Sequence, residues 1–132
     1  MRKRASAVII KDKKLLLVTG KEEDFYWTPG GKLDEGEDFE SALKREVKEE
    51  MDCLVTSMMP YCQYRAEKEE IPNFTVPASE VRAFLVQTKG TIRPQAEVTK
   101  YIWATKEDLK NIRVTKGFRS NVVDRLIREN LL

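Results

Sequence analysis

Three glutamates, Glu46, Glu49 and Glu50, lie within five consecutive positions of this 132-residue sequence. On a helix, residues three and four positions apart are neighbours, so each such pair of like charges disfavours the helix by about 0.2–0.5 kcal/mol. A hard divalent cation such as Mg²⁺ prefers carboxylate oxygens, and it keeps water ligands that a phosphate-bearing substrate can replace. The spacing therefore leaves two alternatives, a divalent-metal site or a solvated, glutamate-rich helix face.

The run Glu37–Met51 has the spacing of an amphipathic helix. On a helical wheel, Glu46 and Glu50 fall inside the apolar stripe and Glu49 falls on its edge. Charged side chains normally lie opposite such a stripe, and burying an unpaired carboxylate is costly. The basic residues of the run lie at the edge and the back of the stripe, so a further cation is expected to neutralise the acids. The stripe itself consists of Phe39, Ala42, Leu43 and Val47.

The segment Pro29–Gly31 precedes this helix and must turn tightly. Paired glycines allow a positive φ and a close approach of backbones. A Walker-type phosphate loop is excluded, because that pattern needs glycine at position 26 and serine or threonine at position 33, where this chain has Tyr26 and Leu33. Two readings remain, an ordinary connection or a rigid loop whose carbonyl groups face the same cation as the helix acids.

The rest of the chain is rich in strands and predicts a mixed β-sheet with helices on both faces, an α/β fold of the α+β kind. A hairpin is expected from 5–10 and 15–19, further strands over 53–58, 61–65, 81–88 and 101–104, and loops over 21–32 and 66–80. A short helical turn is expected over 106–111, and a terminal helix over 120–132 with Ser120 as its N-cap.

Together, the loop and the helix resemble the Nudix hydrolase family. Gly31 is followed after five residues by Glu37, and seven further residues lead to Arg45. The family's box ends in a glycine, and this chain has Asp52 there, a residue that can adopt the left-handed conformation of a helix end. The match spans 23 positions and ends in the run Arg45, Glu46, Val47, Lys48, Glu49, Glu50, Met51, Asp52, Cys53. The approach WTPGGK is similar to the family's entry into the box, and the resemblance implies one Nudix-type α/β/α sandwich domain over residues 1–132.

The resemblance also implies a site that binds Mg²⁺, with Mn²⁺ as the alternative ion. Glu97 stands in EVTKYIW, six residues before Trp103, where similar pyrophosphohydrolases of the MutT kind often carry a metal-site glutamate. Glu37 would pair with Arg45 and orient the helix acids. The general base would be Glu50 or Glu97, since the chain has no histidine. The implied metal ligands are Glu46, Glu49, Glu50, Glu97 and the Gly30 carbonyl, and the implied catalytic set is Glu50, Glu49, Glu97 and Arg45.

The implied activity is hydrolysis of a nucleoside diphosphate linked to another group, with a nucleoside triphosphate as the favoured substrate. ADP-ribose or a nucleotide sugar is the alternative substrate, and a Nudix-like module that binds a nucleotide without cleaving it is the alternative of another class. The complete set of acids argues against the binding module. A helix–sheet domain whose acids are only surface charge is the remaining alternative.

Residues for substrate recognition are less marked in the sequence. Trp27, with its neighbours Phe25 and Tyr26, could stack on a base or belong to the core. Asn121 could bind a purine edge or merely lie in the first turn of the last helix. Lys32 could bind phosphate or remain solvated, and the same holds for Arg65 and Arg82.

Composition excludes several other classes of protein. Lys and Arg number 24 against 22 Asp and Glu, and a net charge of +2 gives no basic surface on the scale that nucleic-acid binding needs. Two cysteines without histidine exclude the common zinc sites and predict free thiols in a reducing compartment. No apolar run approaches ~18 residues or forms a signal sequence, so we expect a cytoplasmic protein without a membrane span. A homodimer is possible, because dimers are common among similar proteins.

Overall fold

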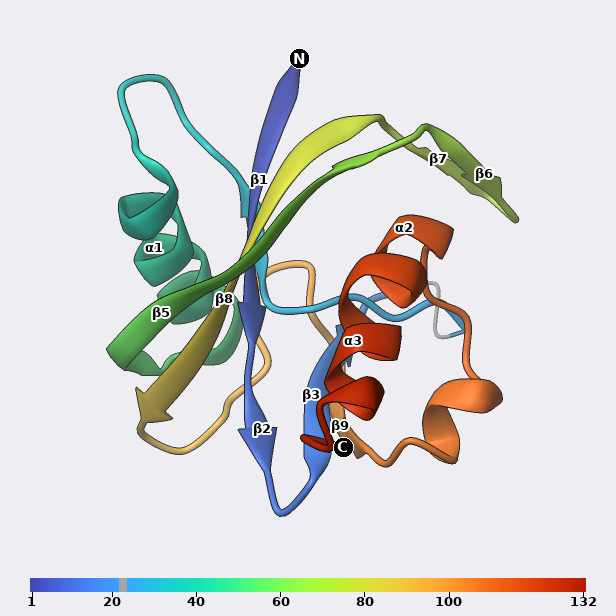
Figure 1. The fold of residues 1–132 in the computed structure, drawn as a ribbon. Helices are drawn as coiled ribbons and strands as arrows, with labels where there is room; N and C mark the ends of the chain where they lie inside the picture. Colours follow the sequence, from blue (N-terminus) through green and yellow to red (C-terminus); the bar gives the residue numbers. More distant parts are fainter. Residues whose placement is uncertain (22–23) are drawn as a thin grey trace.

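The computed structural model describes residues 1–21 and 24–132, and it has three layers (Figure 1). Helix α1 (Phe39–Met51) covers one face of the sheet layer, and the C-terminal helical segment covers the other. The predicted mixed sheet flanked by helices is confirmed. Part of the predicted loop over 21–32, Glu22 and Glu23, lies outside the described residues.

The central sheet has the strand order β4-β1-β8-β5. Strand β1 (Arg2–Val8) pairs in parallel with β8 (Ser79–Lys89) and antiparallel with β4 (Gly30–Lys32), while β5 (Leu54–Ala66) pairs antiparallel with β8. Strand β8 is therefore central, as expected from its apolar run. The short β4 brings the glycine turn to the edge of this sheet, directly beside β1.

The second sheet has the order β2-β3-β9 and contains β2 (Ile10–Lys11), β3 (Lys14–Thr19) and β9 (Lys100–Ala104). The predicted hairpin is correct only at its tip, where β2 pairs with β3. The prediction was wrong for residues 5–8, because β1 leaves the hairpin and pairs with β8 and β4 instead. The apolar run of β3 is buried on both faces, which explains why it lacks a polar alternation.

Strand β5 is continuous, whereas the sequence predicted two strands separated at Pro60. The strand runs through the proline because β5 lies at the edge of the sheet, where a missing N–H group need not disturb the ladder. Irregular register between Val55 and Ser57, and again between Pro60 and Cys62, accommodates the strand's bend.

The segment 66–80, predicted as a loop, contains a further hairpin. Strands β6 (Glu69–Ile71) and β7 (Phe74–Val76) pair antiparallel and project from the ends of β5 and β8 (Figure 1). Short polar strands with a proline at their turn lack the apolar alternation that signals a strand, so the pattern did not reveal them.

Helix α1 begins two residues later than predicted, because Asp38 is its N-cap and accepts a hydrogen bond from the Ser41 N–H at 2.7 Å. The helix ends at Met51 as predicted. Asp52 takes the left-handed conformation with φ 57°, as expected for the position where the family's box has glycine. Its carboxylate lies 2.7 Å from Lys48 Nζ, and this contact contributes to the cap.

The C-terminal helical segment consists of α2 (Lys116–Phe118), the π-helical turn η2 (Arg119–Val123) and α3 (Asp124–Arg128). Ser120 is not the N-cap, so that prediction was wrong. Thr115 is the cap, and its side chain accepts a hydrogen bond from the Phe118 N–H at 3.3 Å, so the helical segment starts five residues earlier than predicted. A 3₁₀ turn, η1 (Asp108–Lys110), lies inside the range 106–111 predicted to be a helical turn.

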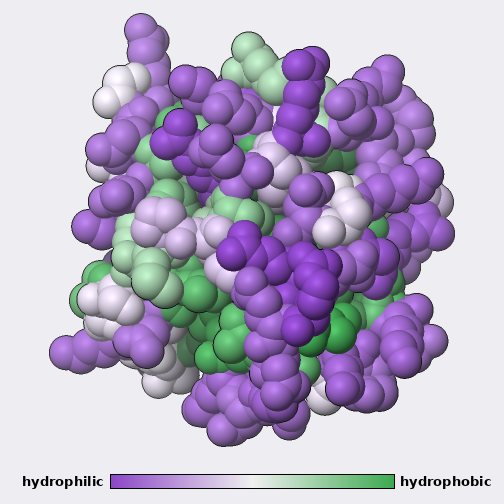
Figure 2. Space-filling model, in the orientation of Figure 1, coloured by the Kyte–Doolittle hydropathy of each residue, from purple (hydrophilic) through white to green (hydrophobic). Residues whose placement is uncertain are grey.

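Two apolar cores lie on the two faces of the sheet layer. One joins α1 to the sheet through Leu43, Val47 and Met51, and the other joins the C-terminal segment to it through Val122 and Leu126. Figure 2 shows that the face in view is mostly hydrophilic, with hydrophobic residues exposed only in separated areas. Within the described part of the chain, no helix has the length and apolar character needed to cross a bilayer.

Candidate metal centre and adjoining cavity

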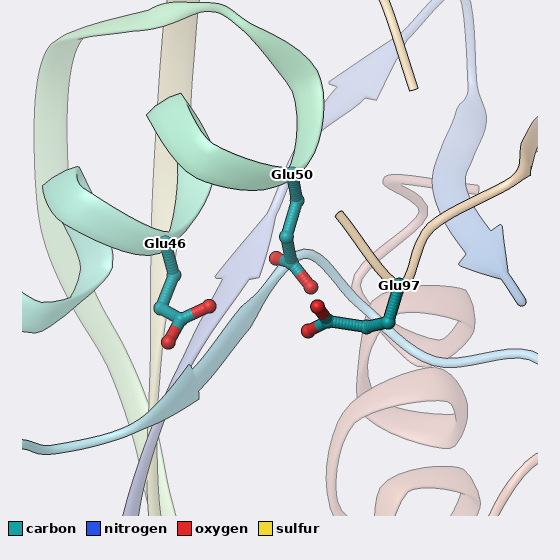
Figure 3. A group of neighbouring side chains, drawn as sticks. All are labelled: Glu46, Glu50 and Glu97. Carbon is teal, nitrogen blue, oxygen red and sulfur yellow. The ribbon is translucent and has the colours of Figure 1, made fainter. Parts of the chain in front are cut away.

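Three carboxylates converge beside the glycine turn (Figure 3). Glu46 and Glu50 come from α1, and Glu97 comes from the loop between β8 and β9. One oxygen from each lies within 4.8 Å of the others. At such distances two charged carboxylates repel by about 3 kcal/mol or more at an effective dielectric constant of ~20.

Glu50 is the most buried member, with 1% of its surface exposed. Its Oε1 accepts a hydrogen bond from the Gly30 N–H at 2.8 Å. The pKa of Glu50 is raised to about 8, mainly by burial and also by the charges of Glu46 and Glu97, against the opposing effects of the Gly30 hydrogen bond and the Arg4 charge. Burial likewise raises the pKa of Glu46. The protein alone therefore does not supply enough positive charge for this cluster.

The glycine turn packs closely against strand β1 on one side and against Glu46 of helix α1 on the other. Gly30 has φ 134°, and a Cβ there would collide with the Ala5 carbonyl oxygen of β1. A Cβ on Gly31 would lie 2.6 Å from the carboxyl carbon of Glu46. The predicted positive φ and close backbone approach are thus both present, and they allow the helix acids to lie directly over the turn.

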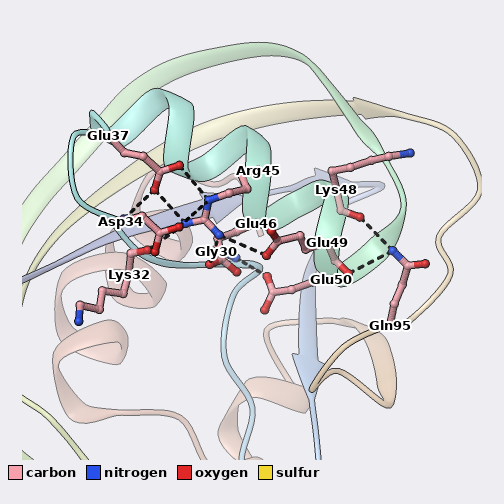
Figure 4. A network of polar contacts seen from close by, with 10 residues as sticks. All are labelled: Gly30, Lys32, Asp34, Glu37, Arg45, Glu46, Lys48, Glu49, Glu50 and Gln95. Carbon is pink, nitrogen blue, oxygen red and sulfur yellow. Dashed lines mark hydrogen bonds and ion pairs between the residues drawn. The ribbon is translucent and has the colours of Figure 1, made fainter.

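Arg45 is the centre of a second polar network at α1, which shares Glu46 with the carboxylate cluster (Figure 4). Its guanidinium contacts Glu37 at 2.8 and 2.9 Å, Glu46 at 2.9 Å and Glu49 at 3.2 Å, and also donates to the Lys32 carbonyl at 3.2 Å. These partners raise the pKa of Arg45, and hydrogen bonding from Arg45 lowers the pKa of Glu37. The Glu37–Arg45 contact implied by the family resemblance is present, and it restrains the guanidinium that holds Glu46.

Glu49 lies apart from the converging carboxylates. Its side chain is 53% exposed and turned toward Arg45, on the outer side of α1. The acids that meet are Glu46, Glu50 and Glu97, rather than the three helix acids that the spacing singled out. A ligand role for Glu49, like that of the Gly30 carbonyl, stays a prediction.

The position of Glu97 depends on a loop that closes the C-terminal end of α1. Gln95 Nε2 donates to the carbonyls of Lys48 and Glu49 at 3.0 and 3.1 Å, and the Gln95 N–H donates to the Glu50 carbonyl at 2.9 Å (Figure 4). The last carbonyls of a helix lack partners within it, so these bonds fix the loop to the helix end. Sequence reasoning missed Gln95, since no local pattern distinguishes it from other loop residues.

A cavity of about 290 Å³ lies on the face of the central sheet opposite α1. Strands β1, β5 and β8 form its floor, and the β6–β7 hairpin and α2 form its walls. Trp27 lines this cavity together with its neighbours, although Tyr26 also belongs to the second core. The ring of Phe25 meets Phe74 of the hairpin edge-on, at 5.5 Å between centroids. The aromatic residues of the lining are Phe25, Tyr26, Trp27, Tyr64, Phe74 and Phe118.

Other predicted substrate residues lie elsewhere. Asn121 is exposed, donates to the Gly117 carbonyl at 2.8 Å and does not line the cavity. The exposed Lys32 side chain extends away from the glutamates (Figure 4). Arg82 lies over the Phe39 ring, 4.4 Å from its centroid, on the α1 face. Arg65 is exposed beside Glu67.

Arg4 is a cavity residue that sequence reasoning missed. Its Nη2 donates to the Thr28 carbonyl at 2.9 Å, and the Thr28 hydroxyl in turn shares a 2.6 Å hydrogen bond with the Ser6 hydroxyl. The spacing of Arg2, Arg4 and Ser6 along a strand places all three on one face, and this was the available signal. It could be used only once the strand's position in the sheet was known.

The model of the NUDIX domain family matches residues 1–126. The chain belongs to the Nudix family. It is accordingly a hydrolase of the kind that cleaves phosphoric anhydrides. Comparison with curated protein sequences gives no significant match.

Solved structures of Nudix proteins have the same fold as this Nudix hydrolase. A MutT Nudix hydrolase from Burkholderia pseudomallei is 24% identical with a TM-score of 0.75, over 90% of this chain and 93% of that one. A MutT structure from work on Aliivibrio salmonicida and Vibrio cholerae is 20% identical with a TM-score of 0.74, over 97% and 98%. An ADP-ribose pyrophosphatase from Streptococcus suis is 19% identical with a TM-score of 0.61, over 96% and 87%. At these identities the likeness shows the fold alone.

The donor set of this Nudix hydrolase fits a hard divalent cation. The converging groups are carboxylate oxygens, and the chain has no histidine. Both cysteines are free thiols outside the cluster, Cys53 buried and Cys62 half-buried. Oxygen donors of this kind suit Mg²⁺ or Mn²⁺ and do not suit softer metals.

Proposed function

We propose that this Nudix hydrolase cleaves the phosphoric anhydride of a nucleoside diphosphate linked to another group, and that the reaction depends on Mg²⁺. The observation that carries the proposal is the convergence of Glu46, Glu50 and Glu97 without enough positive charge from the protein. A nucleoside triphosphate is the favoured substrate. Mn²⁺ is the alternative ion, because it takes the same oxygen donors.

The residues proposed to hold the metal are the three converging glutamates, with Glu49 and the Gly30 carbonyl as further candidates. A bound divalent ion would neutralise phosphate oxygens and make the phosphorus more electrophilic. Glu50 contributes a fixed carboxylate, because Gly30 holds one of its oxygens. Arg45 keeps Glu46 in place, and Glu37 keeps Arg45 in place.

The proton of the attacking water needs a carboxylate within hydrogen-bond reach. Glu50 and Glu97 both face the centre of the cluster, and Glu97 is exposed on the side open to solvent. Either residue could accept the proton, so Glu50→Gln and Glu97→Gln should be compared directly. The variant that lacks the general base should retain weak, metal-dependent turnover, because the other two acids would still bind the metal.

The aromatic cavity is the proposed site for the organic part of the substrate. Aromatic side chains bury the faces of planar rings well, and Phe25 and Trp27 lie with their ring centroids 6.0 Å apart. ADP-ribose or a nucleotide sugar is the second candidate substrate, because the Streptococcus suis neighbour is described as an ADP-ribose pyrophosphatase. A nucleotide-binding module without turnover is the alternative outcome of the test.

The test is a panel of nucleoside triphosphates, nucleotide sugars and ADP-ribose, assayed for phosphate or pyrophosphate release with Mg²⁺, with Mn²⁺ and with a chelator. We expect metal-dependent release from at least one nucleotide, and a loss on the order of 10²–10⁴ in the Glu50→Gln variant. Glu40→Gln is the matched control, because Glu40 is an exposed glutamate of the same helix. Release that persists in the chelator, or undiminished activity of Glu50→Gln, would contradict the assignment.

Two further features of the protein remain predictions. The free thiols of Cys53 and Cys62 agree with a reducing compartment such as the cytoplasm. A homodimer is a possible assembly, and the mass of the protein in solution would test it.

A further inference from the structure

Arg4 places a positive charge at the floor of the cavity, close to the metal centre. Its charge acts on Glu50 and, more weakly, on Glu46. Yet no carboxylate of residues 1–21 or 24–132 lies within ion-pair distance of its guanidinium. The side chain is only partly exposed, and burial lowers the pKa of Arg4. A cation in such a place is costly unless an anion meets it.

The hydrogen-bonding groups of Arg4 are available to a ligand. A guanidinium has five N–H donors, and the bond to the Thr28 carbonyl uses only one of them. Among the described residues, no fully buried side-chain nitrogen lacks a partner, so Nε and Nη1 of Arg4 are not fully buried, and the side chain lines the cavity. The Thr28 carbonyl and the Ser6–Thr28 hydroxyl pair hold the floor beside it.

The position of Arg4 along β1 decides which part of a substrate it can meet. Ser6 pairs with Gly30 of the turn, and Arg4 is two residues farther along the strand toward the hairpin. Two residues of a strand span about 7 Å, so Arg4 lies on the cavity side of the turn whose Gly30 N–H holds Glu50, within reach of a phosphate chain that starts at the glutamates. The aromatic pair Phe25 and Phe74 lines the same cavity.

We propose that Arg4 is a substrate-binding residue that holds the phosphate group leading from the metal centre into the cavity, with the attached organic group between Phe25, Phe74 and Phe118. The inference rests on the proposed function, because it assumes a phosphate chain that begins at the glutamates. A guanidinium binds phosphate through two parallel N–H···O bonds, and the charge of the phosphate supplies the anion that Arg4 lacks. Phe74 would form the outer wall, since it is 37% exposed at the mouth.

The experiment compares ligands that carry or lack the phosphate. A nucleoside 5′-monophosphate, the corresponding nucleoside and inorganic phosphate are titrated calorimetrically against the wild type, Arg4→Met and Arg4→Lys, with Mg²⁺ and with a chelator. In Arg4→Met we expect the affinity for the monophosphate to fall about tenfold to hundredfold, the range of a charge-assisted hydrogen bond. Affinity for the nucleoside should be unchanged, and Arg4→Lys should recover part of the loss.

Lys3→Met is the matched control, because it removes the same charge from an exposed position of β1 that does not line the cavity. An equal loss for nucleoside and monophosphate in Arg4→Met would mean that Arg4 contacts the base, and it would overturn the proposal. Unchanged affinity for both ligands, or inorganic phosphate binding as tightly as the monophosphate, would overturn it too. Circular dichroism and the unfolding midpoint of each variant show that a loss of binding is not a loss of fold.

The outcome is separable from that of the proposed function, because the titration requires no turnover. Hydrolysis by the wild type together with unaltered monophosphate binding by Arg4→Met would refute only the role of Arg4. Phosphate-dependent binding at Arg4 without hydrolysis of any nucleotide would refute the proposed activity and leave the anion site.

Discussion

Two groups of carboxylates with opposite electrostatics lie beside helix α1, an outer group around Arg45 and an inner group around Glu50. On its outer side, Glu37 and Glu49 surround Arg45, which gives them a cation within 3.2 Å. On its inner side, Glu50 meets Glu97 and receives a backbone N–H but no ion-pair partner among the described residues. Arg45 lowers the pKa of Glu37, whereas burial raises that of Glu50 to about 8.

The difference separates the acids that are paired within the protein from those proposed to bind a cation. Glu49 of the outer group and Glu50 of the inner group are adjacent glutamates of the same helix, so neither residue type nor local sequence separates them. The outer group is neutralised when the chain folds, and it fixes the helix to the loop before it. The inner group is assembled by folding but not neutralised by the protein, so we expect its stability to depend on a cation from solution.

Glu50→Gln should have the largest effect on stability, and its sign should depend on metal and pH. The folded-state pKa of Glu50 lies above its unfolded value of 4.5, so its contribution to stability is present below about pH 4.5 and is lost as pH rises toward 8. In a chelator at pH 8, the variant should therefore exceed the wild type in free energy of unfolding by on the order of 3 kcal/mol. Urea unfolding at pH 4.5 and pH 8 measures this difference.

The same measurement with saturating Mg²⁺ should reverse the order. The wild type gains stability from the bound ion, while the variant gains little because one ligand is lost. Glu40→Gln serves as the control and should show no comparable dependence on pH. If the Glu50→Gln variant is less stable than the wild type in the chelator at pH 8, the protein itself already compensates the negative charge of the inner group.

Arg45→Met should have the next largest effect, because it removes the cation of the outer group. Glu37, Glu46 and Glu49 would lose their shared partner, and we expect the free energy of unfolding to fall by about 1–3 kcal/mol. Activity should fall about 10–100-fold through the freed Glu46. Lys44→Met is the control, as an exposed cation of the same helix. Equal effects of the two variants on unfolding and activity would remove the distinction between the outer group and ordinary surface charge.

Gln95→Ala should have the smallest effect on stability and activity. It should act by changing the position of Glu97 rather than by changing a charge. Without its side-chain amide, the carbonyls of Lys48 and Glu49 lose their donor, and we expect a loss of about 0.5–1.5 kcal/mol in unfolding free energy. The Mg²⁺ concentration for half-maximal activity should rise about two- to tenfold, because Glu97 is held less firmly. Gln63→Ala, on the exposed edge of β5, is the control. A variant that loses stability without any change in Mg²⁺ dependence would show that Gln95 does not position Glu97.

Much of the fold was predictable where apolar spacing is strong. Helix α1, the central strand β8 and the pairing at the tip of the β2–β3 hairpin follow from local pattern. The boundaries that failed had competing local signals: Ser120 and Thr115 are both suitable caps, and Pro60 looked like a break although an edge strand tolerates it. The β6–β7 hairpin has too little apolar alternation to be recognised from the sequence.

The sequence by itself determined the identity of the acids, the glycine turn and the inward direction of Glu46 and Glu50, because helical periodicity and glycine's backbone freedom act over a few neighbouring residues. The family resemblance already placed Glu97 with them, whereas only the tertiary structure decided that Glu49 turns to Arg45 and that Arg4 lies in the aromatic cavity. Those contacts join residues that are distant in the chain or depend on which loop and strand pack beside the helix. Their physical cause, the pairing of β1 with β4 and the fastening of the Gln95 loop to the end of α1, exists only once the chain has folded.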